Sequence, residues 1–450
     1  MDARGKFQYL DQNGAVVQEG ACRVHFDAQT FTLTPQTGAA LALDLGDLDS
    51  VTAANYEVRL PVYTGRVIVL RQLGKSYDNL AHDLTEAYRN RAVECLLLED
   101  MQEVARFSAS FELTRSVSAF GPAELRLYQS NLAVLPAAAQ SFQWRLADID
   151  EMHLDSPAYE VVLQCGEDRL KVTRLAKRTE EFCDKLRDAM NALAIKTAQA
   201  LHTMLPFLDP DQLQSCAGVL REGRSAALST LAAIHKQIPA ALAAKAVDQD
   251  LKPYYDKLVA RSASGLGYAG FKLIRAEDGE AADAGSAASA QNESDAEDNA
   301  ASDAPDADAT GPQTLYWFLL PLAAKPGSSV PANVVAWEAS SRAGRATYFF
   351  RLVEPGQAAQ LSDPTRAAAL VDASIHRLNR VLAMLNFRRR PIYLSDDELA
   401  LDPRFHRYAI AARRLPEVRE VRASFLGRAL HTSPEAWQAQ LDSILSKSGA

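Results

Sequence analysis

The chain has 450 residues, too many for one ordinary hydrophobic core, so two to four domains are expected. Hydrophobic residues make up 48% of it and charged residues 23%, values typical of a globular protein. The formal net charge of −9 argues against an affinity of the whole protein for nucleic acid or anionic membranes, although a local basic patch could still bind either.

The cysteines and the apolar segments bear on the compartment. No two of the five cysteines form a CxxC pair, which argues against a disulfide framework or a zinc site and favours a reducing environment. They are Cys22, Cys95, Cys165, Cys183 and Cys216. The N-terminal residues show no apolar stretch of a signal peptide, and the longest apolar run, Leu315 to Leu322, is too short to span a membrane. A soluble, cytoplasmic protein is expected.

The first 195 residues contain one pattern twice. The second occurrence follows the first after about one hundred residues, which is the length of a domain rather than of a solenoid unit. The aligned pairs include Gly20 with Gly121, Asp47 with Asp148, Asp49 with Asp150, Tyr56 with Tyr159 and Arg71 with Arg174. The sequence therefore predicts a duplicated domain.

Each copy has the pattern of short strands followed by one helix. In the second copy, apolar residues alternate with polar ones through Leu125 and Leu127, and the alternation resumes beyond a polar turn at residues 129–131. The spacing then becomes helical, with Phe182 and Leu186 on one face. A small, strongly bent antiparallel sheet with a helix over its open end fits this pattern.

The order of these segments resembles a bacterial pleckstrin-homology-like (PH-like) domain. In the second copy, a hairpin precedes a strand running into LADIDEM, a YEVVL–LKVTRL hairpin and the helix RTEEFCDKLRDAMNAL. In the first copy, LGDLDSV, YEVRL, RVIVLRQL and SYDNLAHDLTEAY follow in the same order. The resemblance implies two tandem β-sandwich or barrel domains, at residues 1–100 and 101–195, each capped by a C-terminal helix.

The resemblance also raises the question of lipid binding. PH-like domains of eukaryotes often bind phosphoinositides through basic residues on the first hairpin. The matching turns here, residues 27–29 and 129–131, contain no Lys or Arg. Because charge-assisted contacts to phosphate would be missing, phosphoinositide binding is not expected from either copy.

Two aspartates separated by one apolar residue recur in both copies. Paired acids can serve metal or acid–base chemistry, so Asp47, Asp49, Asp148 and Asp150 are candidates for such a role. However, the intervening Leu48 and Ile149 are apolar, and alternation turns the leucine and isoleucine inward and the acids outward. We interpret the aspartates as structural residues of a turn that face water.

A helical segment is expected at residues 196–262. Asp209, Pro210 and Gln212 form the start of a helix with a capping box, and Pro239 is expected to end or kink a second helix. A third helix should begin near Asp250.

An α+β region follows, in two pieces at residues 263–275 and 314–390. Between them, residues 276–313 are rich in Ala, Asp, Ser and Glu, and they predict a disordered acidic linker. After the strands of the second piece, Asp363 and Pro364 start a long amphipathic helix. Strands followed by a helix could make this region a diverged third PH-like copy, although no convincing alignment supports it.

The sequence shows no catalytic motif. A GxGxxG occurs at Gly265, Gly267 and Gly270, but a helix precedes it and a strand follows, the reverse of a dinucleotide site, so a flexible hinge is the expected meaning. The histidines form no HExxH motif, and none is spaced with cysteines as in a zinc site. No cofactor, no metal and no enzymatic activity are expected.

Arginines gather in the C-terminal region, residues 391–450, and just before it. The candidate anion- or partner-binding residues are Arg388, Arg389, Arg390, Arg404, Arg407, Arg413 and Arg414. They could form a solvated helical surface, since acids are interspersed, and positive charge also suits a helix C-terminus. Alternatively, they could bind an acidic protein, nucleic acid or the acidic linker of the same chain. The region itself is expected to be a helical tail, with helices starting at Asp402–Pro403 and Ser433–Pro434.

Taken together, these patterns predict an α+β protein that binds rather than catalyses. The expected function is that of a scaffold whose tandem PH-like domains contact another protein. The alternatives are a peripheral membrane protein that binds lipid, a nucleic-acid-associated factor that uses the C-terminal arginines, and an enzyme whose site is scattered over the C-terminal region. The partner and the oligomeric state stay open.

Overall fold

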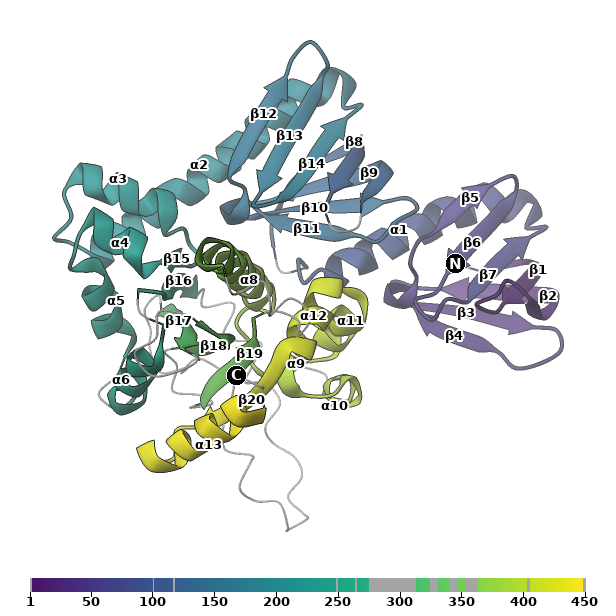
Figure 1. Cartoon of the computed structure of the whole chain (residues 1–450). Helices are drawn as coiled ribbons and strands as arrows, with labels where there is room; N and C mark the ends of the chain where they lie inside the picture. Colours follow the sequence, from purple (N-terminus) through teal and green to yellow (C-terminus); the bar gives the residue numbers. More distant parts are fainter. Residues whose placement is uncertain are drawn as a thin grey trace. The chain divides into compact units, whose positions relative to one another are not determined.

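The computed structural model describes residues 2–99, 101–115, 118–247, 250–263, 265–274, 313–323, 331–339, 346–352, 363–402 and 405–447. The fold is α+β, as the sequence predicts, and 41% of the described residues are helical and 36% are in strands (Figure 1). The chain forms two compact units. The first unit consists of Met1–Asn191 and His406–Pro416, and the second of Ala192–Phe405 and Glu417–Ala450.

The first unit contains two repeats and one helix, α11 (His406–Arg414), from the C-terminal region. The elements of the first repeat are β1 (Asp2–Leu10), β2 (Val16–Phe26), β3 (Thr30–Pro35), β4 (Leu41–Asp44), the 3-10 helix η1 (Leu45–Asp47), β5 (Thr52–Ala54), β6 (Glu57–Pro61), β7 (Val67–Arg71), the 3-10 helix η2 (Gly74–Ser76) and α1 (Tyr77–Cys95). Those of the second repeat are β8 (Glu103–Thr114), β9 (Ala119–Tyr128), β10 (Asn131–Pro136), β11 (Phe142–Arg145), η3 (Leu146–Asp148), β12 (Glu151–Asp155), β13 (Glu160–Cys165), β14 (Asp168–Thr173), η4 (Ala176–Arg178) and α2 (Thr179–Met204), which continues into the second unit.

Strand order and register are the same in the two repeats, which together lie in one compact unit. The two seven-stranded antiparallel sheets have the orders β4-β3-β2-β1-β7-β6-β5 and β11-β10-β9-β8-β14-β13-β12. In the first sheet Phe7 lies opposite Gly20 and Leu70. Phe111 lies opposite Gly121 and Val172 at the matching place of the second sheet. Leu70 therefore corresponds to Val172, and the predicted alignment of Arg71 with Arg174 is wrong by one residue, since Arg71 corresponds to Thr173.

The core of each repeat lies between the bent sheet and its helix. In the first repeat, Leu80 and Leu84 of α1 are fully buried in one cluster with Phe31 and Leu33 of β3. In the second, Phe107 of β8 packs edge-on against Phe182 of α2, with ring centroids 5.2 Å apart. The helix thus covers the apolar face that the sheet alone would leave open.

The second unit is built on a third sheet. Its elements after α2 are α3 (Pro210–Val219), β15 (Ala226–Ala227), α4 (Leu228–Ile234), α5 (Ile238–Ala246), α6 (Lys252–Arg261), β16 (Tyr268–Ile274), β17 (Gln313–Ala323), β18 (Pro331–Ala339), β19 (Ala346–Arg351), α8 (Pro364–Met384), α9 (Arg390–Tyr393), α10 (Asp396–Leu401), α12 (Pro416–Ser424), β20 (Phe425–Leu430) and α13 (Pro434–Lys447). The sheet is an antiparallel meander in the order β15-β16-β17-β18-β19-β20. This is not the strand order of the two repeats, so it does not support a third copy.

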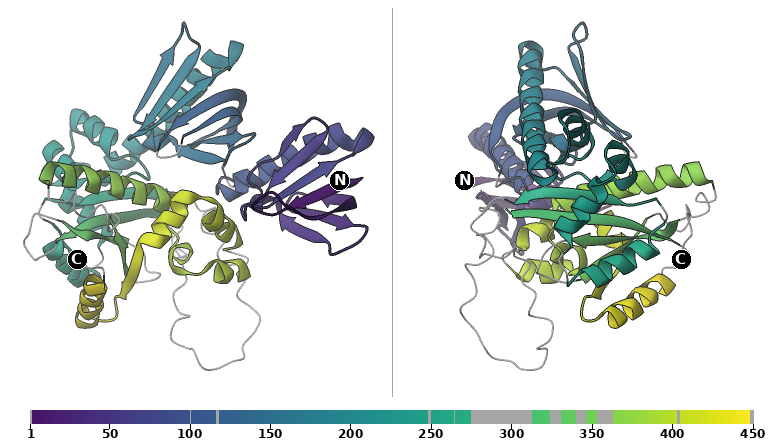
Figure 2. Two further views of the ribbon diagram at one scale, coloured as in Figure 1. Left: turned by 45° about the vertical axis from the view of Figure 1, so that its right-hand side comes forward. Right: turned by 90° about the vertical axis from the view of Figure 1, so that its left-hand side faces the viewer.

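Helices cover both faces of the third sheet (Figure 2). On one face, Phe318, Phe349 and Ala429 form a buried cluster with Leu258 of α6 and Trp437 of α13. On the other face, the Trp317 indole N–H donates to Asn379 Oδ1 of α8 at 3.0 Å. Both residues of this hydrogen bond are buried, so α8 is fixed to the sheet by packing and by a satisfied polar contact.

Two predicted segments are placed differently from expectation. Residues 391–450 are not a separate helical tail, because α11 belongs to the first unit and β20 pairs with β19. The predicted linker lies outside the described residues except for Gln313, the first residue of β17. Gln313 lies opposite Ile274, so the linker joins two neighbouring antiparallel strands.

Helix starts with an Asp–Pro or Ser–Pro signal are mostly confirmed. Asp209 and Gln212 form both hydrogen bonds of a capping box, and α8 and α13 begin at Pro364 and Pro434. The expectation for Pro239 is wrong: it lies in the first turn of α5, where its fixed φ is favourable. A helix start was also expected at Asp402–Pro403, but Pro403 lies outside the described residues.

The glycines of the GxGxxG do not form a hinge. Gly270 lies within β16, and a Cβ there would come within 2.2 Å of the Trp317 ring. Gly267 is packed between Leu228 and Leu320. Glycine is needed at these positions because a neighbouring side chain occupies the space of a Cβ.

Among the helices of the described residues, none has the length and apolarity that crossing a membrane requires.

Candidate functional site: the α11 docking site on the first repeat

A short loop at the end of β4 forms the base of the site. Asp44 Oδ1 accepts a hydrogen bond from the Gly46 N–H at 2.6 Å and so caps η1. The same carboxylate binds the buried Arg91 of α1 in a bidentate pair, with N–O distances of 2.9 and 2.7 Å. Leu48 is buried, as its place in the apolar pattern predicts. The loop is therefore fixed to both the core and α1 by contacts that do not involve α11.

Gly46 gives α11 room to approach this loop. A Cβ at Gly46 would lie 2.7 Å from Cys95 Sγ and 3.1 Å from Ile410 Cγ2 of α11. Ile410 is buried, together with the alanines on either side of it. The glycine is therefore required first by Cys95 of α1 and by Asp44, whose Oδ1 would lie 2.9 Å from the Cβ, and its lack of a side chain also leaves room for Ile410 of α11.

Two adjacent arginines of α11 bind the two aspartates of the loop. Arg413 Nη2 lies 2.9 Å from Asp47 Oδ1, and Arg414 Nη1 lies 2.7 Å from Asp49 Oδ1. Arg414 also donates from Nη2 to the Leu48 carbonyl at 3.0 Å. The side chain of Arg414 is only 8% exposed and its contact with the Leu48 carbonyl is buried, whereas the Asp49 side chain is 46% exposed, so solvent screens the ion pair more than the contact with the carbonyl. The planar guanidinium contacts a side chain and a backbone oxygen at the same time.

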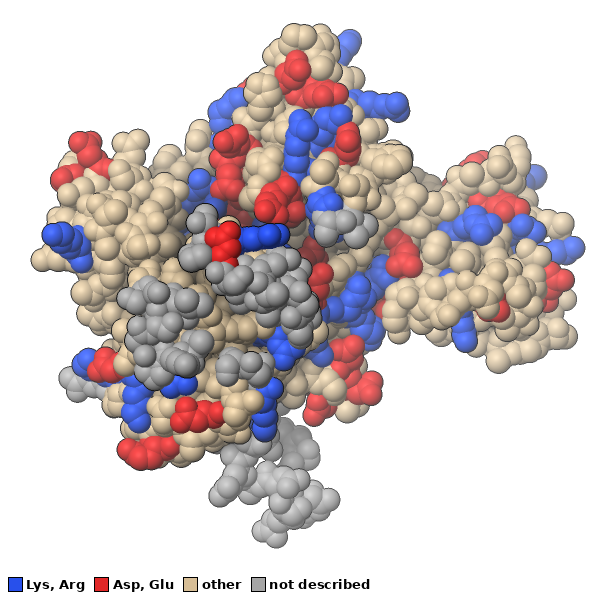
Figure 3. All heavy atoms as spheres, viewed as in Figure 1, with Lys and Arg blue, Asp and Glu red and all other residues tan. Residues whose placement is uncertain are grey.

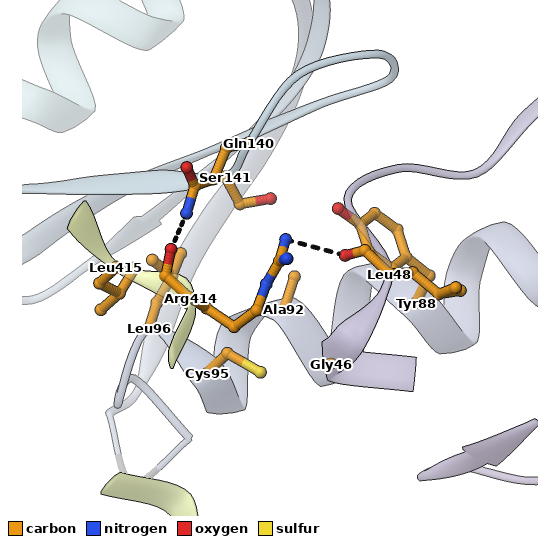
Figure 4. Close-up of a pocket in the computed structure, with 10 residues that line it drawn as sticks. All are labelled: Gly46, Leu48, Tyr88, Ala92, Cys95, Leu96, Gln140, Ser141, Arg414 and Leu415. Carbon is orange, nitrogen blue, oxygen red and sulfur yellow. Dashed lines mark hydrogen bonds between the residues drawn. The ribbon is translucent and has the colours of Figure 1, made fainter. Parts of the chain in front are cut away.

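α11 also contacts the second repeat and the segment between the repeats. The Gln140 side-chain amide donates to the Arg414 carbonyl (Figure 4). Arg407 forms an ion pair with Glu99. The helix therefore holds the loop of the first repeat, the connection after α1 and the β10–β11 turn of the second repeat in one arrangement.

A small cavity lies beside Arg414. It is lined by Gly46, Leu48, Tyr88, Ala92, Cys95, Leu96, Gln140, Ser141, Arg414 and Leu415, and its volume is about 20 Å³. This is room for a water molecule but not for an organic ligand. Burial raises the pKa of Tyr88 and that of Cys95, each to about 12. Tyr88 therefore remains a hydrogen-bond donor to the Asp49 carbonyl, at 2.8 Å, and Cys95 remains a thiol at neutral pH.

The matching loop of the second repeat has different chemistry. Arg145 stands where the first repeat has Asp44, and Ala147 stands where it has Gly46. Asp148 is buried, with Arg145 Nη1 3.9 Å from its Oδ2, while Asp150 is exposed and accepts from the Gly166 N–H at 2.8 Å. The prediction that all four aspartates face water is thus wrong for Asp148, which is buried, and for Asp47, whose side chain is 17% exposed beneath Arg413. Asp49 also binds α11, but its side chain remains 46% exposed.

The predicted arginine cluster is divided between the two units. Arg407, Arg413 and Arg414 belong to the first unit. In the second unit, Arg388 is half-buried, Arg389 is buried near the Tyr348 ring, and Arg390 lies 3.8 Å from Asp402. Arg404 lies outside the described residues. No single compact unit therefore contains this cluster. Arg413 and Arg414 of the α11 contact were identified as candidates from the sequence. That Asp47 and Asp49 are the carboxylates that bind them was not predicted.

Gly46→Ala, which introduces the residue of the second repeat, is expected to destabilise the first unit. The new methyl group overlaps Cys95 and crowds Ile410, and overpacking of this kind costs about 1 to 3 kcal/mol. Urea denaturation of the variant measures the loss. Gly218→Ala is the matched control, because nothing lies within 4 Å of a Cβ there and alanine favours a helix. An unchanged stability of Gly46→Ala would show that α11 does not need this close approach.

A second buried polar cluster lies in the second unit. Thr347 Oγ1 donates to Glu338 Oε2 at 2.6 Å, and His431 Nε2 lies 3.0 Å from the threonine oxygen and 3.3 Å from the carboxylate. The Trp437 indole N–H donates to the same threonine oxygen at 3.0 Å. One imidazole nitrogen faces both partners and the threonine has no exposed surface, so the geometry is that of a structural network rather than of an activated nucleophile.

The described residues contain no group of three or more His, Cys, Asp or Glu side chains arranged to hold a metal ion. Comparison of the chain with protein-family models gives no match, and a search of curated proteins gives no similar protein.

Proposed function

We propose that the protein is a non-enzymatic scaffold whose tandem repeats bind helical segments of proteins. The observation that supports this is the contact between the first repeat and α11, in which Asp47 and Asp49 bind two adjacent arginines. A preformed loop with outward carboxylates and a glycine at its centre suits an amphipathic helix with a small apolar face and a basic end. The partner would be another protein that carries such a helix.

The contacts of α11 favour this proposal over nucleic-acid binding through the same arginines. Arg407, Arg413 and Arg414 already contact carboxylates of the first unit, so they would have to exchange those partners for phosphates.

For a cytoplasmic location, the support is that all five cysteines are buried and free of disulfides.

The test uses the full-length chain and a fluorescent peptide of residues 405–418. In the unaltered protein, the covalently attached helix has an effective concentration of the order of millimolar and excludes the peptide. Replacing both arginines, Arg413→Ala with Arg414→Ala, weakens the binding of α11 to the first repeat. Fluorescence anisotropy should then show that the peptide binds at micromolar concentrations.

The control adds Asp47→Asn and Asp49→Asn to that variant, and these changes should abolish peptide binding. Asp150→Asn, at the matching exposed position of the second repeat, should leave it unchanged. The proposal that the first repeat recognises a basic helix would be refuted if the peptide did not bind the arginine variant. It would also be refuted if Asp47→Asn and Asp49→Asn left peptide binding unchanged.

A further inference from the structure

The outer face of the first sheet carries a row of cations that its strand register places side by side. Arg4 of β1 lies directly opposite Arg23 of β2, and Lys6 lies directly opposite Arg71 of β7. Arg59 of β6 lies opposite Val69, two residues from Arg71. Together Arg23, Arg4, Lys6, Arg71 and Arg59 form a diagonal across four strands, about 20 Å long. We call this row the basic stripe.

All five residues point away from the core. The alternate residues of the same strands, such as Phe7, Val24 and Leu70, are in the buried cluster. Val69, between Arg59 and Arg71 on the outer face, is outside that cluster, although it has no exposed surface either. Arg4, Lys6, Arg23 and Arg59 are exposed, and the Arg71 side chain is 40% exposed. Figure 3 shows Lys and Arg side chains over β6 and β7, with acidic side chains beside them.

Neighbouring acids neutralise only part of the stripe. Asp2 Oδ1 lies 3.2 Å from Arg23 Nε, and Glu57 Oε1 lies 2.7 Å from Arg71 Nε. Arg4, Lys6 and Arg59 have no ion-pair partner within the described part of the chain. Like charges directly opposite each other destabilise a sheet, so both cross-strand pairs cost folding energy unless an anion lies over them.

The second repeat shows that the fold does not need these cations. By register, Ser108 and Ser110 stand at the places of Arg4 and Lys6, because Phe111 matches Phe7. Thr173 stands at the place of Arg71, and Val162 at that of Arg59. The stripe is therefore a property of the first repeat alone, added to a shared scaffold.

We propose that the basic stripe binds an acidic protein segment in an extended conformation. Side chains on one side of an extended peptide recur about every 7 Å, which matches the distance between Arg4 and Lys6 along β1. Arginine guanidinium groups bind carboxylates through paired hydrogen bonds. The five residues of the stripe include no aromatic ring, and the exposed His25 imidazole beside Arg23 contacts the Asp2 carboxylate, so single-stranded nucleic acid is disfavoured. This surface and its ligand are separate from the α11 docking site and its basic helix.

The experiment is a titration of the full-length protein with a fluorescein-labelled peptide of alternating Glu and Ser, about ten residues long. Binding is expected at low ionic strength and should weaken steeply as salt is added. Arg4→Ser with Lys6→Ser, the residues of the second repeat, should weaken it about tenfold. Thermal unfolding should show no loss of stability in this variant, because like-charge repulsion is relieved.

The control removes the same charge elsewhere. Lys236→Ser with Lys245→Ser changes two exposed lysines of the second unit and should leave peptide binding within about twofold of the unaltered protein. Equal weakening by both pairs of substitutions, or no binding of the peptide at low salt, would overturn the proposal. Tighter binding of labelled single-stranded RNA or of anionic phosphatidylserine vesicles than of the peptide, with the same dependence on Arg4 and Lys6, would overturn it as well.

Discussion

Arg414→Ala is expected to lower the free energy of unfolding of the first unit by about 2 to 4 kcal/mol. The substitution removes the contacts to Asp49 and to the Leu48 carbonyl, and it leaves this carbonyl without its donor in a site from which solvent is largely excluded. Most of the loss should come from the buried contact with the Leu48 carbonyl, because the Asp49 side chain is 46% exposed and solvent screens its ion pair with Arg414. The consequence should be release of α11 from the first repeat.

Hydrogen–deuterium exchange over residues 405–416 measures this release, and urea denaturation measures the stability. Arg414→Lys should recover only part of the loss, because an ammonium group lacks the planar fork that contacts two oxygens. Arg187→Ala, on the exposed face of α2, is the matched control and should change stability by less than about 0.5 kcal/mol. Unchanged exchange in α11 after Arg414→Ala would show that apolar contacts alone hold the helix.

Glu338→Ala should be the most damaging single substitution in the second unit, at about 3 to 5 kcal/mol. The carboxylate accepts from Thr347 and lies beside His431, so its removal leaves both groups buried without their acceptor and also creates a cavity. Glu338→Gln keeps the volume and one acceptor oxygen, and it should cost less.

Tryptophan fluorescence is a suitable probe for this loss. Of the four tryptophans, Trp317, Trp337 and Trp437 lie in the second unit and only Trp144 lies in the first. The emission change in urea therefore reports mainly the second unit. Glu435→Ala, in the exposed first turn of α13, is the control. Equal midpoints for Glu338→Ala and Glu435→Ala would contradict the structural role of the cluster.

The local and periodic features of the fold could be predicted from the sequence. The duplicated sheet followed from an alternation repeated after about one hundred residues, because a buried face requires it in both copies. The capping box at Asp209 and the helix starts at Pro364 and Pro434 depend only on neighbouring residues, so they were also predictable.

Contacts between distant segments could not be predicted in this way. The pairing of Arg413 with Asp47 joins residues far apart in the chain, and no local pattern specifies which acid faces which base. The same limit applies to Gly270, where the reason for glycine is the Trp317 ring on a neighbouring strand. Asp148 was misjudged because it lies at the end of the 3-10 helix η3, where the alternation of side chains along a strand does not apply.

The discontinuity of the first unit has a consequence during protein synthesis. The ribosome completes Asn191 long before it reaches His406, and at about 5 to 20 residues per second the intervening chain takes roughly 10 to 40 s to translate. Throughout this interval the nascent repeats lack α11. The apolar surface around Gly46 and the carboxylates of Asp47 and Asp49 are then accessible to chaperones or to other proteins. Co-translational maturation of the N-terminal part therefore has to wait for nearly the whole message to be read.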